Sequence, residues 1–226
     1  MRVRGIVRGG FIVTLALVAG LPAGVAPAWQ RPEISQKVEI ENEQVLVMRV
    51  TIPPGYSGEM HSHALPGLEV FLTDDHIRET LPDGSQHEWR AKAGEVAWIA
   101  PVTHRVENLR DRPTEIISIE FKTLPASALA APSDEATREL ENEWVNVTRG
   151  RIEGRTKGSA HTHPNYIGVF LTDAHLRIHL PDGSTREVTG KRGGISWREA
   201  VTHSIENLVD VPFEAVDVNL KPPRGN

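Results

Sequence analysis

The sequence predicts an all-β protein made of two tandem β-barrels, and three observations carry this prediction. The 226 residues contain 19 Gly and 16 Pro, which are many turn-forming residues for a chain of this length. The apolar residues come in short β-branched runs, and no window sustains the 3.6-residue period of an amphipathic helix. The third observation is an internal repeat, in which one series of runs and turns occurs twice. Many short strands at regular spacing are typical of a sandwich or a barrel.

The repeat keeps its register over most of its length. Phe71–Asp74 matches Phe170–Asp173, and Leu81–Ser85 matches Leu180–Ser184, at an offset of 99 residues. About half of the aligned residues are identical, far above the level that ordinary composition produces. Further upstream the offset is 100, so the second copy has lost one residue.

The repeat divides the chain into four expected parts. These are a signal peptide at 1–28, a first barrel at 37–122, a linker at 123–137 and a second barrel at 138–221. The linker is rich in Ala, Ser and Pro, a composition that favours a connection between domains.

Each expected strand of the first copy is an apolar run rich in β-branched residues. Such runs lie at 45–52, 68–73, 96–99 and 116–121. The Pro-Asp-Gly triplets that begin at Pro82 and Pro181 predict tight turns, because Pro presets φ and Gly supplies a positive φ.

The first 28 residues have the features of an export signal. Three Arg lie within the first eight positions, an apolar run follows at 9–21, and Ala26 and Ala28 fit a signal-peptidase site. The run is short for a membrane-spanning helix. We therefore expect cleavage before Trp29 and a periplasmic or secreted protein without a stable membrane anchor; an uncleaved anchor is the alternative.

Composition excludes several classes of function. A formal net charge of −5 with no basic block argues against a nucleic-acid partner. The absence of Cys excludes disulfides, thiolate catalysis and Cys-based zinc or iron–sulfur sites. No nucleophile elbow, phosphate loop or zincin helix is present.

The histidines are the residues that indicate a functional site in this sequence. Six of the ten His form two matching triads: His61, His63 and His104, and His161, His163 and His203. A His-x-His pair on a strand places two imidazoles on one face. The third His comes from a distant segment, so only a fold that joins two strands can unite the triad. Three converging neutral imidazoles are typical of a transition-metal site.

The two triads differ in the carboxylate that could complete them. Glu69 lies two residues before Phe71 and therefore shares its strand face, so Glu69 could be a fourth ligand or a base. The matching residue in the second copy is Gly168, which leaves three His and an open position. The alternatives are that Glu69 is a surface residue and that either triad has lost its metal.

The pattern of these residues resembles the cupin superfamily. In the first copy, the residues that match its two motifs are Gly55, His61, His63 and Glu69, then Gly94, Pro101, His104 and Asn108. The spacing before Glu69 is one residue longer than usual. The second copy keeps its triad and Asn207, but Gly168 replaces the Glu and Ala200 replaces the Pro.

The resemblance implies a double-stranded β-helix (jelly-roll) barrel for each copy, with a metal inside each barrel. The tandem arrangement is similar to bicupins, a class that includes oxalate decarboxylases and quercetin-type dioxygenases. Local detail is nearer to small single-domain bacterial cupins, whose second motif is similar to Trp197–Ser204. Fold alone does not fix function.

Three functions stay open at this point. The first is a metal-dependent enzyme that acts on a small organic molecule, as a dioxygenase or a decarboxylase. The second is a non-enzymatic protein that binds a small ligand or a metal. The third is a structural pair of barrels. Fe(II), Mn(II), Ni(II) and Zn(II) all suit three His and one Glu. Arg198 and Glu199 could hold an anionic substrate or form a surface ion pair. Exposed sheet edges would permit a homo-oligomer.

Overall fold

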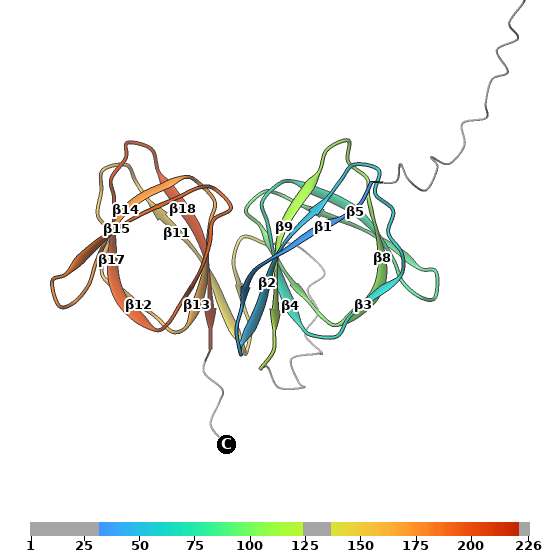
Figure 1. Cartoon of the computed structure of the whole chain (residues 1–226), viewed down its shortest axis with the longest axis horizontal. Helices are drawn as coiled ribbons and strands as arrows, with labels where there is room; N and C mark the ends of the chain where they lie inside the picture. Colours follow the sequence, from blue (N-terminus) through green and yellow to red (C-terminus); the bar gives the residue numbers. More distant parts are fainter. Residues whose placement is uncertain (1–31, 124–136, 222–226) are drawn as a thin grey trace, which may run out of the picture. The chain divides into compact units, whose positions relative to one another are not determined.

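The computed structural model describes residues 32–123 and 137–221, so the expected signal peptide and most of the expected linker lie outside the described residues. Within the described ranges the structure contains eighteen β-strands and no helix. The all-β prediction is therefore confirmed. Figure 1 shows the strands of each repeat curving around an interior.

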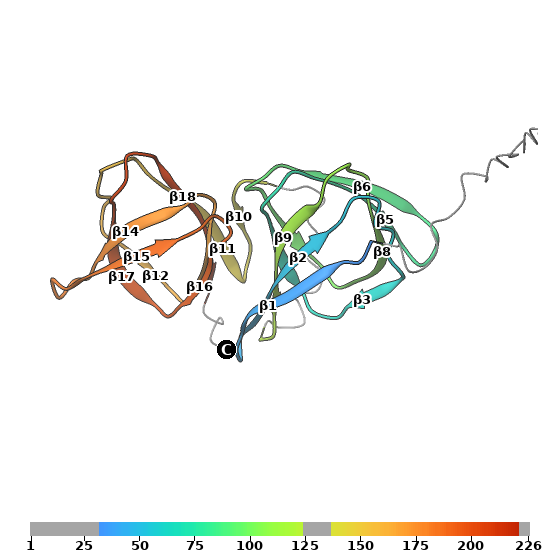
Figure 2. The same ribbon diagram turned by 45° about the horizontal axis from the view of Figure 1, so that its top comes forward.

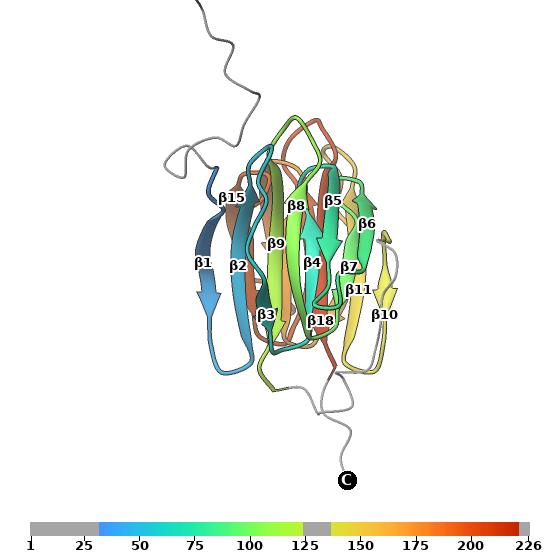
Figure 3. The ribbon, with the colours of Figure 1, turned by 90° about the vertical axis from the view of Figure 1, so that its right-hand side faces the viewer.

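The first repeat forms two antiparallel sheets. Its strands are β1 (Ser35–Glu41), β2 (Val45–Ile52), β3 (His61–His63), β4 (Gly67–Phe71), β5 (Asp75–Thr80), β6 (Gln86–Ala91), β7 (Val96–Ile99), β8 (Val102–Asn108) and β9 (Thr114–Phe121). One sheet has the order β1-β2-β9-β4-β7 and the other the order β3-β8-β5-β6. Figure 3 shows β1 at the edge of the first of these sheets, beside β2.

The second repeat uses the same topology. Its strands are β10 (Leu140–Glu141), β11 (Val145–Ile152), β12 (His161–His163), β13 (Tyr166–Phe170), β14 (Ala174–His179), β15 (Thr185–Gly190), β16 (Ile195–Arg198), β17 (Val201–Asn207) and β18 (Phe213–Leu220). The sheet orders are β10-β11-β18-β13-β16 and β12-β17-β14-β15. In Figure 2, β14, β15 and β17 lie across the barrel from β18 and β11.

The alternation of side chains explains why these residues form barrel walls. Along β2, Val45, Val47, Val50 and Ile52 are buried, and the residues between them are at most half-buried. Successive side chains of a strand point to opposite faces, so Val45 and Val47 lie on one face of β2 and Val50 and Ile52 on the other. The first pair packs in a cluster that includes residues of both repeats, and the second pair packs in a separate core of the first barrel.

The predicted Pro-Asp-Gly turns are present in both repeats. Gly84 and Gly183 each have φ of +85°, a conformation that side-chain-bearing residues rarely adopt. In the first turn the Asp83 carboxylate accepts hydrogen bonds from the backbone N–H and the hydroxyl of Ser85. The triplet therefore closes the β5–β6 hairpin, as its equivalent closes β14–β15.

One hydrophobic cluster includes buried residues of both repeats. Trp98 is buried and stacks on Phe121 of its own repeat and on Trp144 of the other, with ring centroids 5.6 Å apart in both pairs. Trp197, the equivalent residue of the second repeat, packs half-buried against the same cluster. The two barrels thus share a core.

Equivalent residues make reciprocal contacts between the repeats. The Arg49 guanidinium donates to the carbonyl of Gly193, and the Arg149 guanidinium donates to the carbonyl of Gly94. Because both repeats use the same surface, the contact resembles the isologous interface of a symmetric dimer.

Candidate metal centres

Strand pairing brings each His triad together. In the first barrel β3 lies antiparallel to β8, with His61 directly opposite His104. In the second barrel β12 lies antiparallel to β17, with His161 directly opposite His203. In each triad the three ligand atoms lie within 4.8 Å of one another. The structure therefore contains two clusters that could each hold a metal ion.

The rings of each triad meet edge to face rather than stacking. In the first triad the ring centroids are 4.8–5.3 Å apart, with interplanar angles between 64° and 83°. In the second triad the centroids are 4.7–5.3 Å apart, and the Nε2 atoms of His203 and His161 face each other at 3.1 Å. Ring nitrogens that approach so closely suit a shared cation.

Hydrogen bonds to Nδ1 orient five of the six rings. The two exposed rings use backbone carbonyls: His61 Nδ1 lies 3.0 Å from the Glu59 oxygen, and His161 Nδ1 lies 2.9 Å from the Ser159 oxygen. An Nδ1–H that donates in this way leaves Nε2 free as a ligand and fixes the ring orientation.

The other oriented rings use side chains that the sequence analysis missed. The Glu79 carboxylate accepts from His104 Nδ1 at 2.5 Å, and the Glu120 carboxylate lies 3.4 Å from His63 Nδ1. In the second barrel the Asn219 Oδ1 accepts from His163 Nδ1 at 2.6 Å. Neutral imidazoles anchored at Nδ1 are the donor set that a transition metal needs, so these residues fit a metal ion.

The electrostatic surroundings keep two of the imidazoles neutral. Burial lowers the pKa of His63, and the neighbouring His104 and His61 lower it further. Burial, with His161 and His163 next in effect, lowers the pKa of His203 to about 4. Neutral His is the protonation state that binds metal.

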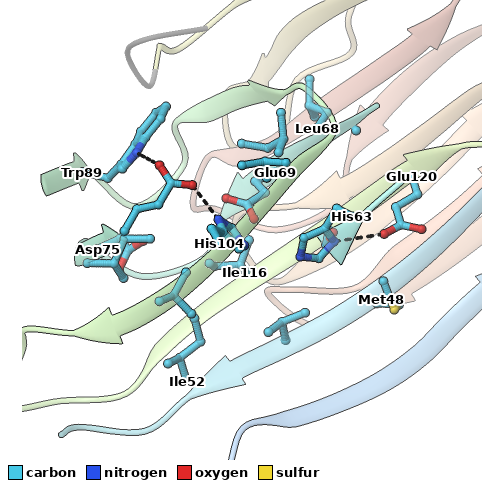
Figure 4. A pocket seen from close by; sticks show the side chains of 18 of the residues that line it. Met48, Ile52, His63, Leu68, Glu69, Asp75, Trp89, His104, Ile116 and Glu120 are labelled. Carbon is cyan, nitrogen blue, oxygen red and sulfur yellow. Dashed lines mark hydrogen bonds and ion pairs between the residues drawn. The ribbon is translucent and has the colours of Figure 1, made fainter. Parts of the chain in front are cut away.

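Glu69 faces the cavity of the first barrel but stands apart from the His cluster. It lines a cavity of about 240 Å³ together with the triad, Asp75 and Glu79, as Figure 4 shows in part. Burial, with the nearby Asp75 and Glu79 next in effect, raises the pKa of Glu69 to about 8. The group of atoms within 4.8 Å comprises the three His and not Glu69. Its proposed place as a fourth ligand stays a prediction.

The second barrel encloses a cavity of about 320 Å³ with a different lining. Arg186 and Arg198 line it, with Tyr166, Asp217 and two His of the triad. Within the described residues neither Arg forms an ion pair, and Glu199 is exposed. Of the two interpretations of Arg198, the position beside the cavity favours contact with a ligand over a pair with Glu199.

The remaining conserved-looking motif residues have structural contacts. Asn108 is buried, and its Nδ2 donates to the carbonyls of Ile52, Pro53 and Arg112. Asn207 makes equivalent contacts with Ile152 and Val211. These contacts give each Asn a structural role, which joins the end of its strand to neighbouring backbone carbonyls.

Comparisons with known proteins were made at three levels. No protein-family profile matches the chain, and no curated protein matches it either. Many solved structures do match, and they share its fold. Within residues 32–123 and 137–221, no helix has the length and apolar character needed to cross a membrane.

Three of the matching structures illustrate the class. AerE from Microcystis aeruginosa aligns with a TM-score of 0.64 at 14% identity, over 87% of this chain and 97% of its own. The formate complex of Lactobacillus farciminis oxalate decarboxylase aligns at 0.60 and 13%, over 84% and 81%. Bacillus subtilis oxalate decarboxylase, described for its Mn(II) centres, aligns at 0.54 and 13%, over 81% and 71%. This chain has the cupin fold, in the tandem arrangement of a bicupin.

Proposed function

We propose that this protein is an exported bicupin that binds a divalent transition metal in each barrel and acts as a metal-dependent enzyme on a small organic molecule. The observation that carries the proposal is the anchoring of the triads. Nδ1 contacts hold five rings, while each triad gathers its ligand atoms within 4.8 Å. Hydrogen bonds that fix the orientation of ligand imidazoles in this way are typical of first-row transition-metal sites.

The reaction type we propose is decarboxylation or dioxygenation. A bound divalent ion would supply Lewis-acid chemistry or a place for O2 beside a chelated substrate. Mn(II) is the first ion to test, because a structural neighbour is described for its Mn(II) centres; Fe(II), Ni(II) and Zn(II) suit the same ligands.

The chain's own residues give the first cavity a proton donor. With its pKa raised to about 8, Glu69 holds a proton on its carboxyl group near neutral pH. Apolar side chains such as Ile52 and Ile116 line the same cavity. A protonated carboxyl group beside them can deliver its proton to a carbanion-like product, which decarboxylation requires.

The second cavity favours an anionic ligand. A divalent ion with neutral His ligands is positive, and Arg186 and Arg198 add positive charge to the lining. Arg presents a planar set of donors that matches a carboxylate. We therefore propose a small carboxylic acid as the ligand class of this barrel.

The first test is elemental analysis of the purified mature protein and of His61→Ala and His161→Ala. We expect about two metal ions per chain, with one lost in each variant. The loaded protein is then assayed for O2 uptake and for CO2 release from small carboxylic acids. Absence of metal after reconstitution with Fe, Mn, Ni and Zn contradicts the metalloenzyme proposal. Saturable ligand binding without product instead supports the alternative, a non-enzymatic binding protein.

Export is tested separately. The mature N-terminus of the protein, recovered from the periplasm or the medium, is sequenced. We expect it to begin at Trp29, because Ala26 and Ala28 precede that position. Retention of the first 28 residues in a membrane fraction contradicts this expectation.

A further inference from the structure

The two barrels carry one carboxylate each at the same cross-strand pair, but on opposite strands. In the first barrel Glu69 of β4 lies directly opposite Ser118 of β9. In the second barrel the equivalent pair is Gly168 of β13 opposite Asp217 of β18. The acidic side chain has therefore changed strands while the pair has kept its place in the barrel.

The surrounding residues make room for the carboxylate in its new position. A Cβ built on Gly168 would lie 3.5 Å from Asp217 Oδ1, and one built on Gly150 would lie 3.8 Å from Asp217 Oδ2. Gly150 occupies the place of the buried Val50 of the first barrel. Asp217 thus fills the space that a side chain at position 168 would use.

Asp217 points into the second cavity without a partner of its own. It lines that cavity together with His161 and His203, although the group of atoms within 4.8 Å comprises the three His and not Asp217. The Asp217 side chain is half-buried, and within the described residues no side chain donates to it or pairs with it. A buried carboxylate without a partner is unfavourable unless a cation or a proton neutralises it.

We propose that Asp217 is the carboxylate of the second metal centre, supplied from β18 in place of the one that β13 lacks at Gly168. This inference rests on the proposed binding of metal by the second triad. It changes the interpretation of that centre from three His with an open position to three His and an acid.

The experiment measures metal affinity at the second centre alone. The parent is the full mature chain with His61→Ala and His104→Ala, which removes the first triad. Mn(II) and Zn(II) are titrated into the metal-free parent and into its Asp217→Asn derivative, and the Mn(II) electron paramagnetic resonance spectrum is recorded for each. Asn has the size of Asp and removes only the charge. We expect affinity to fall about 10- to 100-fold, the range typical when a carboxylate supporting a metal site is lost.

A second variant transplants the first-barrel arrangement. The triple change Gly168→Glu, Ser196→Ala and Asp217→Ser reproduces the residues at Glu69, Ala97 and Ser118. Ser196→Ala is included because a Cβ at Gly168 would lie 3.3 Å from Ser196 Oγ. We expect this variant to bind metal within a few-fold of the parent, whereas Asp217→Ser alone does not.

The outcomes separate the two proposals. If His161→Ala abolishes metal binding in the parent while Asp217→Asn leaves affinity and spectrum unchanged, the role of Asp217 is overturned and the triad stands. If the parent binds no metal at all, the proposed function of the second centre fails, and Asp217 with it. Thermal melts of every variant show whether a loss of metal binding reflects a loss of folding. If Asp217→Asn does not fold, metal binding by the triple variant decides whether a carboxylate at this strand pair supports the second centre.

Discussion

At the scale of single residues, the groups that hold the His rings matter as much as the rings. Glu79 accepts from His104 Nδ1 and from Trp89 Nε1 at 3.3 Å, so its orientation is fixed from two sides. The hydrogen bond from His104 lowers the pKa of Glu79, which keeps the carboxylate charged. The equivalent residue of the second barrel is Ile178, so His203 has no such support there.

Replacing Glu79 by Gln is expected to weaken the first centre. Gln retains an acceptor but loses the negative charge beside His104 Nδ1, so metal affinity there should fall about 10-fold or more. Isothermal titration in a His161→Ala background measures this centre alone. The matched control is the second centre, titrated in a His61→Ala background, where Glu79→Gln should not change the affinity. Equal affinities in Glu79→Gln and its parent would contradict the support role.

Glu69 predicts a pH dependence of stability in the metal-free protein. Its folded-state pKa is raised from 4.5 to about 8 by burial, so the unfolded chain ionises first as pH rises. The stability contributed by protonated Glu69 is therefore full below about pH 4.5 and is lost as pH rises toward 8, at about 1.4 kcal/mol per pKa unit as an upper limit.

The measurement is urea unfolding of the apo protein between pH 5 and 9. Glu69→Gln should remove most of the decline and be the more stable protein at pH 8.5. Glu33→Gln, at an exposed position, is the control and should follow the wild-type curve. A Glu69→Gln curve parallel to the wild type contradicts this account.

At the scale of elements, Asn108 joins the end of β8 to the end of β2. Its Nδ2 donates to the carbonyls of Ile52 and Pro53, both near the point where β2 ends. Asn108→Ala leaves these carbonyls without that donor, so we expect a loss of about 1–3 kcal/mol in the free energy of unfolding. Asn207→Ala should cost a similar amount, because Asn207 makes the equivalent contacts. Losses below about 0.5 kcal/mol, the range of ordinary surface substitutions, contradict this role.

The strands show what the sequence could predict. The buried strands, such as β2 and β9, have β-branched runs, and the expected runs at 45–52 and 116–121 coincide with them closely. The runs missed β1, β3, β5, β6 and β8. Of these strands, β1 and β6 are mostly exposed and polar, so they carry no apolar signal. Their place is set by pairing with a neighbouring strand, which one sequence does not reveal.

The residues of the candidate sites also fall into those that the sequence predicted and those that it did not. The His-x-His spacing and the repeat together predicted both triads, because equivalent positions repeated the same unusual residues. Glu79, Glu120 and Asp217 carry no such signal, since acidic residues are common on strands and the matching positions differ between the repeats. Only barrel closure places them beside a His ring or in a cavity.

At the scale of the whole molecule, the shared core couples the barrels. Trp98 contacts Trp144 across the repeats, and Leu72 and Val147 belong to the same buried cluster. Neither barrel could therefore unfold alone without exposing apolar surface of the other, at about 25 cal/mol per Å² exposed. The reciprocal hydrogen bonds of Arg49 and Arg149 between the repeats also couple the two barrels.

The last prediction follows from this coupling. Differential scanning calorimetry of the apo mature protein should show one transition whose calorimetric and van't Hoff enthalpies agree. Leu72→Ala, in the shared cluster, should lower the midpoint of that single transition, with a loss of about 2–5 kcal/mol. Leu176→Ala, in the separate core of the second barrel, is the comparison and should also shift the whole transition. Two resolved transitions, each shifted by only one of the variants, would instead show that the barrels unfold independently.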